Sequence, residues 1–64
     1  MIYPDDAALL LAIRRAARGN GWATLWEILA EHPGSYVLDS LIRLQRDDVL
    51  AYRRVGNAEE WRLV

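Results

Sequence analysis

The stretch from Ser35 to Leu50 constrains the fold of this chain more than any other segment. With about 100° of rotation per residue, a helix through Val37, Leu41 and Leu44 carries one apolar stripe. Polar and charged side chains occupy the opposite arc, namely Ser35, Tyr36, Asp39, Arg43, Arg46 and Asp47. One side of this helix is therefore predicted to pack on a core, while the other side is presented to a partner.

The size and composition of the chain indicate one small domain. The 64 residues include no cysteine, so neither a disulfide nor a thiolate metal site can form. The single histidine, His32, gives no convincing zinc site, and we predict neither a bound metal nor a cofactor. A domain of this size is marginally stable, so it depends on good core packing or on a partner chain.

No run approaches the roughly 20 apolar residues of a membrane helix, and no signal peptide is recognisable. We therefore expect a protein of the cytoplasm, or of the host cytoplasm if the chain is viral, with no membrane partner. Its net charge is −1 and its pI is about 5.7, which counts against a dedicated nucleic-acid binder. All eight basic residues are arginine and none is lysine. Arginine and alanine both have GC-rich codons, so the many alanines indicate that codon usage, rather than selection for phosphate contacts, explains the absence of lysine.

Capping signals predict the first two helices. A helix is expected over residues 4–18, because Pro4 suits a first helical turn and Gly19-Asn20-Gly21 tolerates the left-handed backbone of a helix end. The pattern Thr24-x-x-Glu27 is a capping box, in which each residue satisfies a free N–H group of the other. It predicts a second helix over residues 24–32.

The third helix is expected over residues 35–47, with Ser35 as its N-cap. After it, alternating apolar and polar residues predict a β-hairpin over residues 49–64, with a turn at Gly56–Glu59. The predicted fold class is mainly α with a small β-hairpin. Trp61 of the hairpin is assigned to the core, where a small domain needs large apolar side chains.

The order of helix, short strand, helix, turn, helix, strand, turn and strand resembles the winged helix-turn-helix domain of small prokaryotic and viral regulators. The stretches that carry the resemblance are Thr24–Leu29, Ser35-Tyr36-Val37, Asp48-Val49-Leu50 and Trp61-Arg62-Leu63. In this family, glycine usually stands where this chain has Asp48. The resemblance covers nearly the whole chain, and it implies a single three-helix winged-helix domain over residues 1–64.

The resemblance also implies a transcription regulator that binds double-stranded DNA as a dimer, with the third helix in the major groove and the wing on the backbone. Carried over by position, the DNA-binding residues are Ser35, Tyr36, Asp39, Arg43, Arg46, Arg53 and Arg54. Arg43 is expected to pair with guanine, while Arg53 and Arg54 contact the backbone. Two features oppose this assignment: Asp39 repels phosphates, and the wing turn has no basic residue.

Several of these residues also have a simpler interpretation. Asp39 and Arg43 are four residues apart, so they can pair on a solvated helix face with a gain of about 0.2–0.5 kcal/mol. Arg53 and Arg54 are neighbours on a strand and point to opposite faces, so at most one of them meets DNA.

The alternative function is a winged-helix module for protein–protein interaction. Trp26, Leu38 and Ile42 lie off the apolar stripes of their helices and are expected to be partly exposed. Such a patch suggests a protein partner or a dimer, unless the hairpin or an end segment covers it. Trp22, in contrast, is assigned to the core together with Trp61.

We do not expect an enzyme. His32, Ser35 and Asp39 lie close in sequence, but nothing in the chain supplies an oxyanion hole or a substrate pocket. His32 is more simply a favourable group at the C-terminal end of the second helix. No catalytic residue is therefore assigned.

Overall fold

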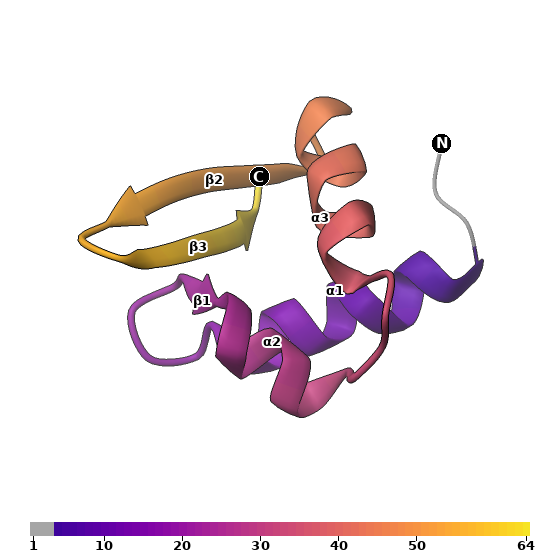
Figure 1. The fold of residues 1–64 in the computed structure, drawn as a ribbon, viewed down its shortest axis with the longest axis horizontal. Helices are drawn as coiled ribbons and strands as arrows, with labels where there is room; N and C mark the ends of the chain where they lie inside the picture. The colour runs from indigo at the N-terminus through magenta and orange to yellow at the C-terminus, as the bar shows by residue number, and fades with distance from the viewer. Residues whose placement is uncertain (1–3) are drawn as a thin grey trace.

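The computed structural model describes residues 4–64 as three helices and a three-stranded antiparallel sheet (Figure 1). In chain order, the elements are α1 (Pro4–Ala16), β1 (Ala23–Thr24), α2 (Leu25–Glu31), α3 (Val37–Arg46), β2 (Leu50–Val55) and β3 (Ala58–Leu63). The expected order of helices and strands is confirmed. Residues 1–3 of the predicted domain lie outside the described residues.

Helix α1 ends at Ala16, two residues before the predicted end. The next residues form turns, in which the Gly21 N–H donates to the Ala17 carbonyl at 2.9 Å. A left-handed residue was expected within Gly19-Asn20-Gly21. It is Gly21, whose φ is +86°. The turn brings the chain back to begin β1 beside α1.

Helix α2 starts as its capping box predicts. The Thr24 side-chain oxygen accepts from the Glu27 N–H at 3.2 Å, and the Glu27 carboxylate accepts from the Thr24 N–H at 2.9 Å. Two of the free N–H groups at the helix start are thus satisfied. The helix ends at Glu31, because His32 precedes a proline and adopts an extended φ of −143°.

Helix α3 begins at Val37, and its N-cap is Tyr36. The assignment of Ser35 as the N-cap is therefore wrong. Ser35 and Tyr36 form a turn, no side chain caps the helix, and its first backbone bond runs from the Ser40 N–H to the Tyr36 carbonyl at 3.0 Å. Both turn residues are left exposed in front of the helix.

The C-terminal end of α3 closes in a Schellman motif. The Asp48 N–H donates to the Gln45 carbonyl at 3.1 Å, and the Val49 N–H donates to the Leu44 carbonyl at 2.9 Å. Asp48 has a φ of +62°, in the left-handed region that favours glycine. The position where glycine was expected by resemblance is thus the position whose backbone suits glycine.

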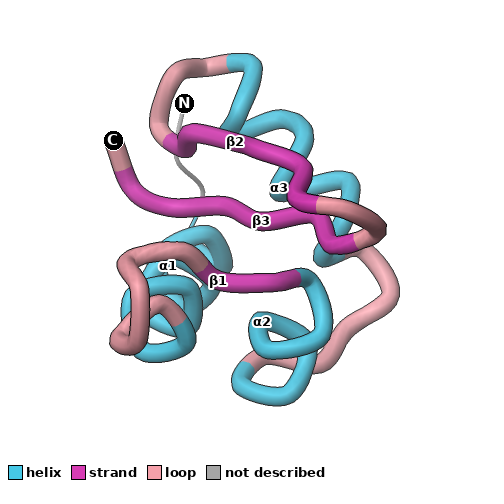
Figure 2. The backbone as a smooth tube through the Cα atoms, turned by 90° about the vertical axis from the view of Figure 1, so that its left-hand side faces the viewer, coloured by secondary structure: helices cyan, strands magenta, loops and turns pink. Residues whose placement is uncertain are grey.

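The sheet has the strand order β1-β3-β2, with β3 in the middle (Figure 2). β1 pairs with β3 through Ala23 and Trp61, and β2 pairs with β3 as far as Val55 and Ala58. The hairpin turn is therefore only Gly56-Asn57, and the predicted turn over residues 56–59 was two residues too long. Gly56 has a φ of +61°, as a type II′ turn requires at its first central residue.

The core lies between the three helices and the inner face of the sheet. Its buried members are Leu9, Ile13, Ala23, Ile28, Val37, Leu41, Leu44, Leu50 and Trp61. The apolar stripe predicted for the third helix is confirmed, as is the placement of Trp61 in the core. No helix within residues 4–64 combines the length and the apolar character needed to cross a membrane.

The placement of Trp22 in the core was wrong, because it is only half-buried and lies over arginine side chains. The Arg53 and Arg62 guanidinium carbons lie 4.4 and 5.2 Å from the centre of its ring. Trp22 precedes β1 by one residue, so it points to the face opposite the buried Ala23. It therefore makes cation–π contacts on the outer face of the sheet.

Candidate interaction surface

One flank of α3 is closed by an ion pair with α1. Arg43 Nη2 donates to Asp6 Oδ1 at 2.6 Å, and Asp6 is only 3 % exposed. A buried carboxylate needs such a partner, because an unpaired charge away from water is costly. Arg43 therefore pairs with a residue of the first helix, which was not among the two interpretations of Arg43 left open by the sequence, a pair with Asp39 or a contact with DNA.

The other flank of α3 is turned toward the hairpin. Gln45 lies on this flank, where its side-chain oxygen accepts a hydrogen bond from Trp61 Nε1 at 3.1 Å. Leu38 and Ile42 precede Gln45 by seven and three residues, so they follow the same side of the helix. They are 42 % and 44 % exposed, which confirms that these two apolar side chains are only partly covered.

Trp26 is the most exposed tryptophan of the described residues, at 79 %. It lies in the first turn of α2, about 100° from Leu25, so the helix directs it away from the core. The expectation that Trp26 is exposed is confirmed. Neither the hairpin nor an end segment within residues 4–64 covers it.

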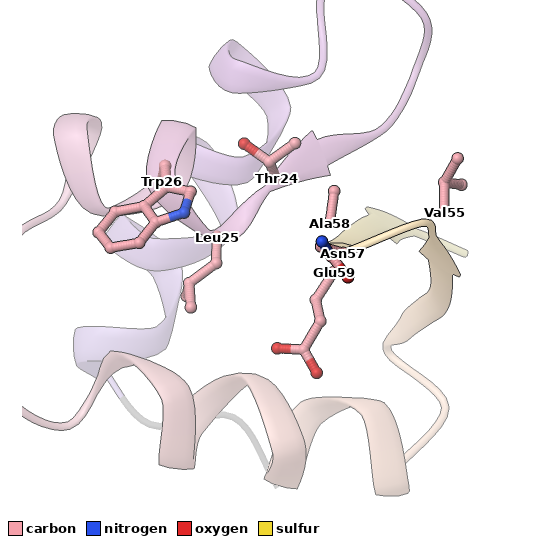
Figure 3. A pocket seen from close by; sticks show the side chains of 7 residues that line it. All are labelled: Thr24, Leu25, Trp26, Val55, Asn57, Ala58 and Glu59. Carbon is pink, nitrogen blue, oxygen red and sulfur yellow. The ribbon is translucent and has the colours of Figure 1, made fainter.

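Trp26 borders a hollow of about 440 Å³ between the start of α2 and the tip of the hairpin (Figure 3). The hollow is lined by Thr24, Leu25, Trp26, Val55, Asn57, Ala58 and Glu59. It exists because the chain leaves the sheet at Thr24 to begin α2. β1 therefore pairs only with Glu60 and Trp61, and the tip of β3 extends beyond it.

A carboxylate lies at the border of this hollow. The Tyr52 hydroxyl donates to Glu59 Oε1 at 3.1 Å, and Figure 3 shows the Glu59 side chain extending in the same direction as that of Leu25. Partial burial, the hydrogen bond to Glu59 and its negative charge raise the pKa of Tyr52 above its ordinary value of 10.0, while Arg54 opposes this shift. The hollow thus combines apolar walls with a hydrogen-bond acceptor.

The arginines assigned to DNA do not form one positive surface. Arg53 Nε donates to Glu60 Oε1 at 2.6 Å on the outer face of the sheet, and Glu60 is buried. Arg54 is exposed on the other face, opposite Glu59 in the strand register. The two neighbouring arginines thus point to opposite faces, as expected, and each lies beside a carboxylate.

The other residues assigned to DNA are exposed, namely Ser35, Tyr36, Asp39 and Arg46. Asp39 and Arg46 are seven residues apart, so they lie two turns apart on the same side of α3. The exposed part of this helix therefore offers one acid, one base and the apolar pair Leu38 and Ile42.

Several members of this surface were missed by sequence reasoning. Val55 was assigned only to a strand of the hairpin and Glu59 only to its turn, and neither was assigned to a surface. The capping box located the start of α2, and the glycine at position 56 located the tip of the hairpin. No local pattern, however, indicated that these two segments meet around a hollow.

Within residues 4–64, no three histidine, cysteine, aspartate or glutamate side chains gather in a way that would hold a metal ion. Comparisons with protein-family models, with curated proteins and with solved structures found no match. The role of the surface is therefore inferred from its own chemistry.

Proposed function

We propose that this chain is a winged-helix domain whose function is to bind protein. The proposed binding surface, the apolar face, combines residues that line the hollow with two on the hairpin flank of α3, namely Leu25, Trp26 and Val55 with Leu38 and Ile42. The single observation that carries the proposal is the 79 % exposure of Trp26 beside a hollow. Large exposed apolar patches mark interaction sites, and tryptophan is enriched among the residues that dominate binding energy.

Two features support the winged-helix assignment. The order of helices and strands is the one that the family has, including the short strand before the second helix. Asp48 stands at the family's glycine position and has a φ of +62°. Fold alone does not determine function, so the winged-helix assignment is compatible with a protein partner as well as with DNA.

The partner chemistry follows from the charges beside the apolar face. Glu59 borders the hollow, and Asp39 is exposed on α3. A segment that presents aliphatic or aromatic side chains together with an N–H donor or a basic group complements both the apolar and the acidic part. Phosphate, by contrast, is repelled by these carboxylates.

A peptide-display selection against the folded chain tests this proposal. We expect the selected peptides to share apolar anchors, and we expect Trp26→Ala to weaken their binding at least tenfold while the circular dichroism spectrum is unchanged. Leu11→Ala is the matched control, because Leu11 is an exposed apolar residue of α1 and not part of the apolar face. Failure to enrich peptides, or equal binding by Trp26→Ala, would overturn the proposal.

Double-stranded DNA is the second candidate, and the exposure of Arg46 and Arg54 favours it. If DNA is the ligand, Arg46→Ala and Arg54→Ala should each weaken binding and lower the salt dependence by about one ion, while Trp26→Ala has little effect. Fluorescence anisotropy with duplex DNA at two salt concentrations measures both quantities. The proposed protein module predicts negligible DNA affinity at physiological salt.

A further inference from the structure

We propose that the partner of the apolar face is a second copy of this chain, with Trp26 of each copy seated in the hollow of the other around a two-fold axis. This inference rests on the proposed protein-binding function and names its partner. Three features support it: the shape of the apolar face, the chemistry of the hollow and the area that the apolar face exposes.

The shape of the face suits two-fold pairing. In a two-fold interface the same patch serves both copies, so it must contain both a projection and the recess that receives it. Trp26 is the projection, and it lines the recess of its own copy. The projection and the recess lie side by side on each copy, so a single two-fold rotation can place each Trp26 in the hollow of the other copy and form a closed dimer. If the recess lay on a distant surface, the same contact would join the copies head to tail into open filaments.

The chemistry of the hollow suits an indole. Its volume of about 440 Å³ lies within the range of roughly 300–1,000 Å³ that holds compact organic ligands. Leu25 and Val55 provide apolar contacts for the ring. The indole N–H needs an acceptor when it is buried, and the Glu59 carboxylate and the Asn57 side-chain carbonyl both border the recess.

The area of the face predicts a weak dimer. Trp26 alone exposes on the order of 200 Å², and the whole apolar face offers on the order of 500 Å² per copy. A standard interface takes about 800 Å² from each partner, and smaller ones are usually transient. We therefore expect a dissociation constant on the order of 10–100 µM, so dimers form only at elevated protein concentration.

The free edge of β2 is a poorer place for self-association. β2 is an outer strand of the sheet, and its two consecutive arginines, Arg53 and Arg54, are exposed. Antiparallel pairing of two such edges would bring the arginines of one copy close to those of the other. Like charges opposed across a strand pair are destabilising, and charged residues protect sheet edges from pairing.

Analytical ultracentrifugation of the full chain from about 1 to 300 µM tests the inference, a range that brackets the expected dissociation constant. The weight-average mass of the wild type should rise from one chain of 7.4 kDa toward two. Trp26→Ala should remain monomeric, while Leu11→Ala should dimerise like the wild type. A wild type that stays monomeric, or a Trp26→Ala variant that dimerises equally, would overturn the inference.

These outcomes distinguish failure of the dimer proposal from failure of the proposed protein-binding function. If the wild type stays monomeric while the selected peptides still bind in a Trp26-dependent manner, the protein-binding function holds and the identity of the partner is wrong. A second measurement needs no mass analysis: the melting temperature of the wild type should rise with protein concentration, and that of Trp26→Ala should not. A melting temperature that is equally independent of concentration in both would contradict the dimer.

Discussion

The two flanks of α3 differ in what occupies them. On the flank next to α1, Arg43 is bound to the buried Asp6. On the flank next to the hairpin, Leu38 and Ile42 remain partly exposed. The buried group on the first flank is thus the Asp6 carboxylate, while the Arg43 side chain stays 32 % exposed and the apolar side chains of the second flank are exposed slightly more.

This difference separates the two tasks of one helix. The ion pair joins the first and third helices, and its buried carboxylate makes the contact specific. The apolar flank contributes less to the isolated fold, because water still reaches it. The closed flank is therefore expected to determine stability, and the exposed flank to determine binding.

The sharpest test compares two neighbours on α3. Leu41→Ala removes a fully buried side chain and should lower the free energy of unfolding by about 3 kcal/mol, whereas Ile42→Ala should lower it by less than about 1 kcal/mol. Urea denaturation of both variants measures this difference. Equal losses would mean that the hairpin flank is as well packed as the core.

The closed flank is tested by Asp6→Asn, which keeps the volume of the side chain and removes its charge. We expect a loss of about 2–3 kcal/mol in the free energy of unfolding, because the charge attraction between Asp6 and Arg43 is lost. Asp5→Asn is the matched control, since Asp5 is exposed and its neutralisation should cost only about 0.5 kcal/mol. Similar small losses in both variants would show that the ion pair does not hold this flank closed.

The Schellman motif at the C-terminal end of α3 is tested by Asp48→Gly. Glycine adopts a positive φ without strain, so this change should raise the free energy of unfolding by about 0.5–1 kcal/mol. Asp47→Gly should lower it instead, because Asp47 has a negative φ of −86° and a glycine there only adds conformational freedom to the unfolded chain. Thermal melts of the two variants should therefore shift in opposite directions, and a destabilised Asp48→Gly would contradict this account.

The smallest effect concerns the hydrogen bond at the border of the hollow. Glu59→Gln removes the negative charge that helps to raise the pKa of Tyr52, so this pKa should fall toward 10.0. Because the pKa of Tyr52 is higher in the folded state than in the unfolded state, the protonated phenol stabilises the fold below pH 10. This stabilisation is lost as the pH rises through the pKa that Tyr52 has in the folded protein. NMR titration of the Tyr52 ring measures the shift, and an unchanged pKa in Glu59→Gln would exclude this electrostatic coupling.

Features that depend on a few neighbouring residues were predictable from sequence. The capping box at Thr24 and the apolar stripe of α3 each follow from residues within one or two turns, whereas the glycine-like position of Asp48 came from the family resemblance. The exposure of Trp26 also followed, because helix geometry alone places it off the apolar stripe of α2.

Features that depend on distant parts of the chain were not predictable. A local rule offered Asp39 as a partner of Arg43, but the structure pairs Arg43 with Asp6, which is 37 residues away in sequence. Trp22 was assigned to the core because it is large and apolar, yet the pairing of β1 with the distant β3 places it on the outer face of the sheet, against Arg53. The hollow was missed for the same reason, since it depends on where β1 stops relative to the hairpin tip.

The pairing of Ala23 with Trp61 has a consequence for synthesis of the chain on the ribosome. Translation at about 5–20 residues per second separates these two partners by about 2–8 s. During that interval Ile13 and Ile28 lack the contacts with Trp61 that complete their burial in the folded core. The hydrophobic core therefore cannot close during synthesis until the segment that carries Trp61 has been made.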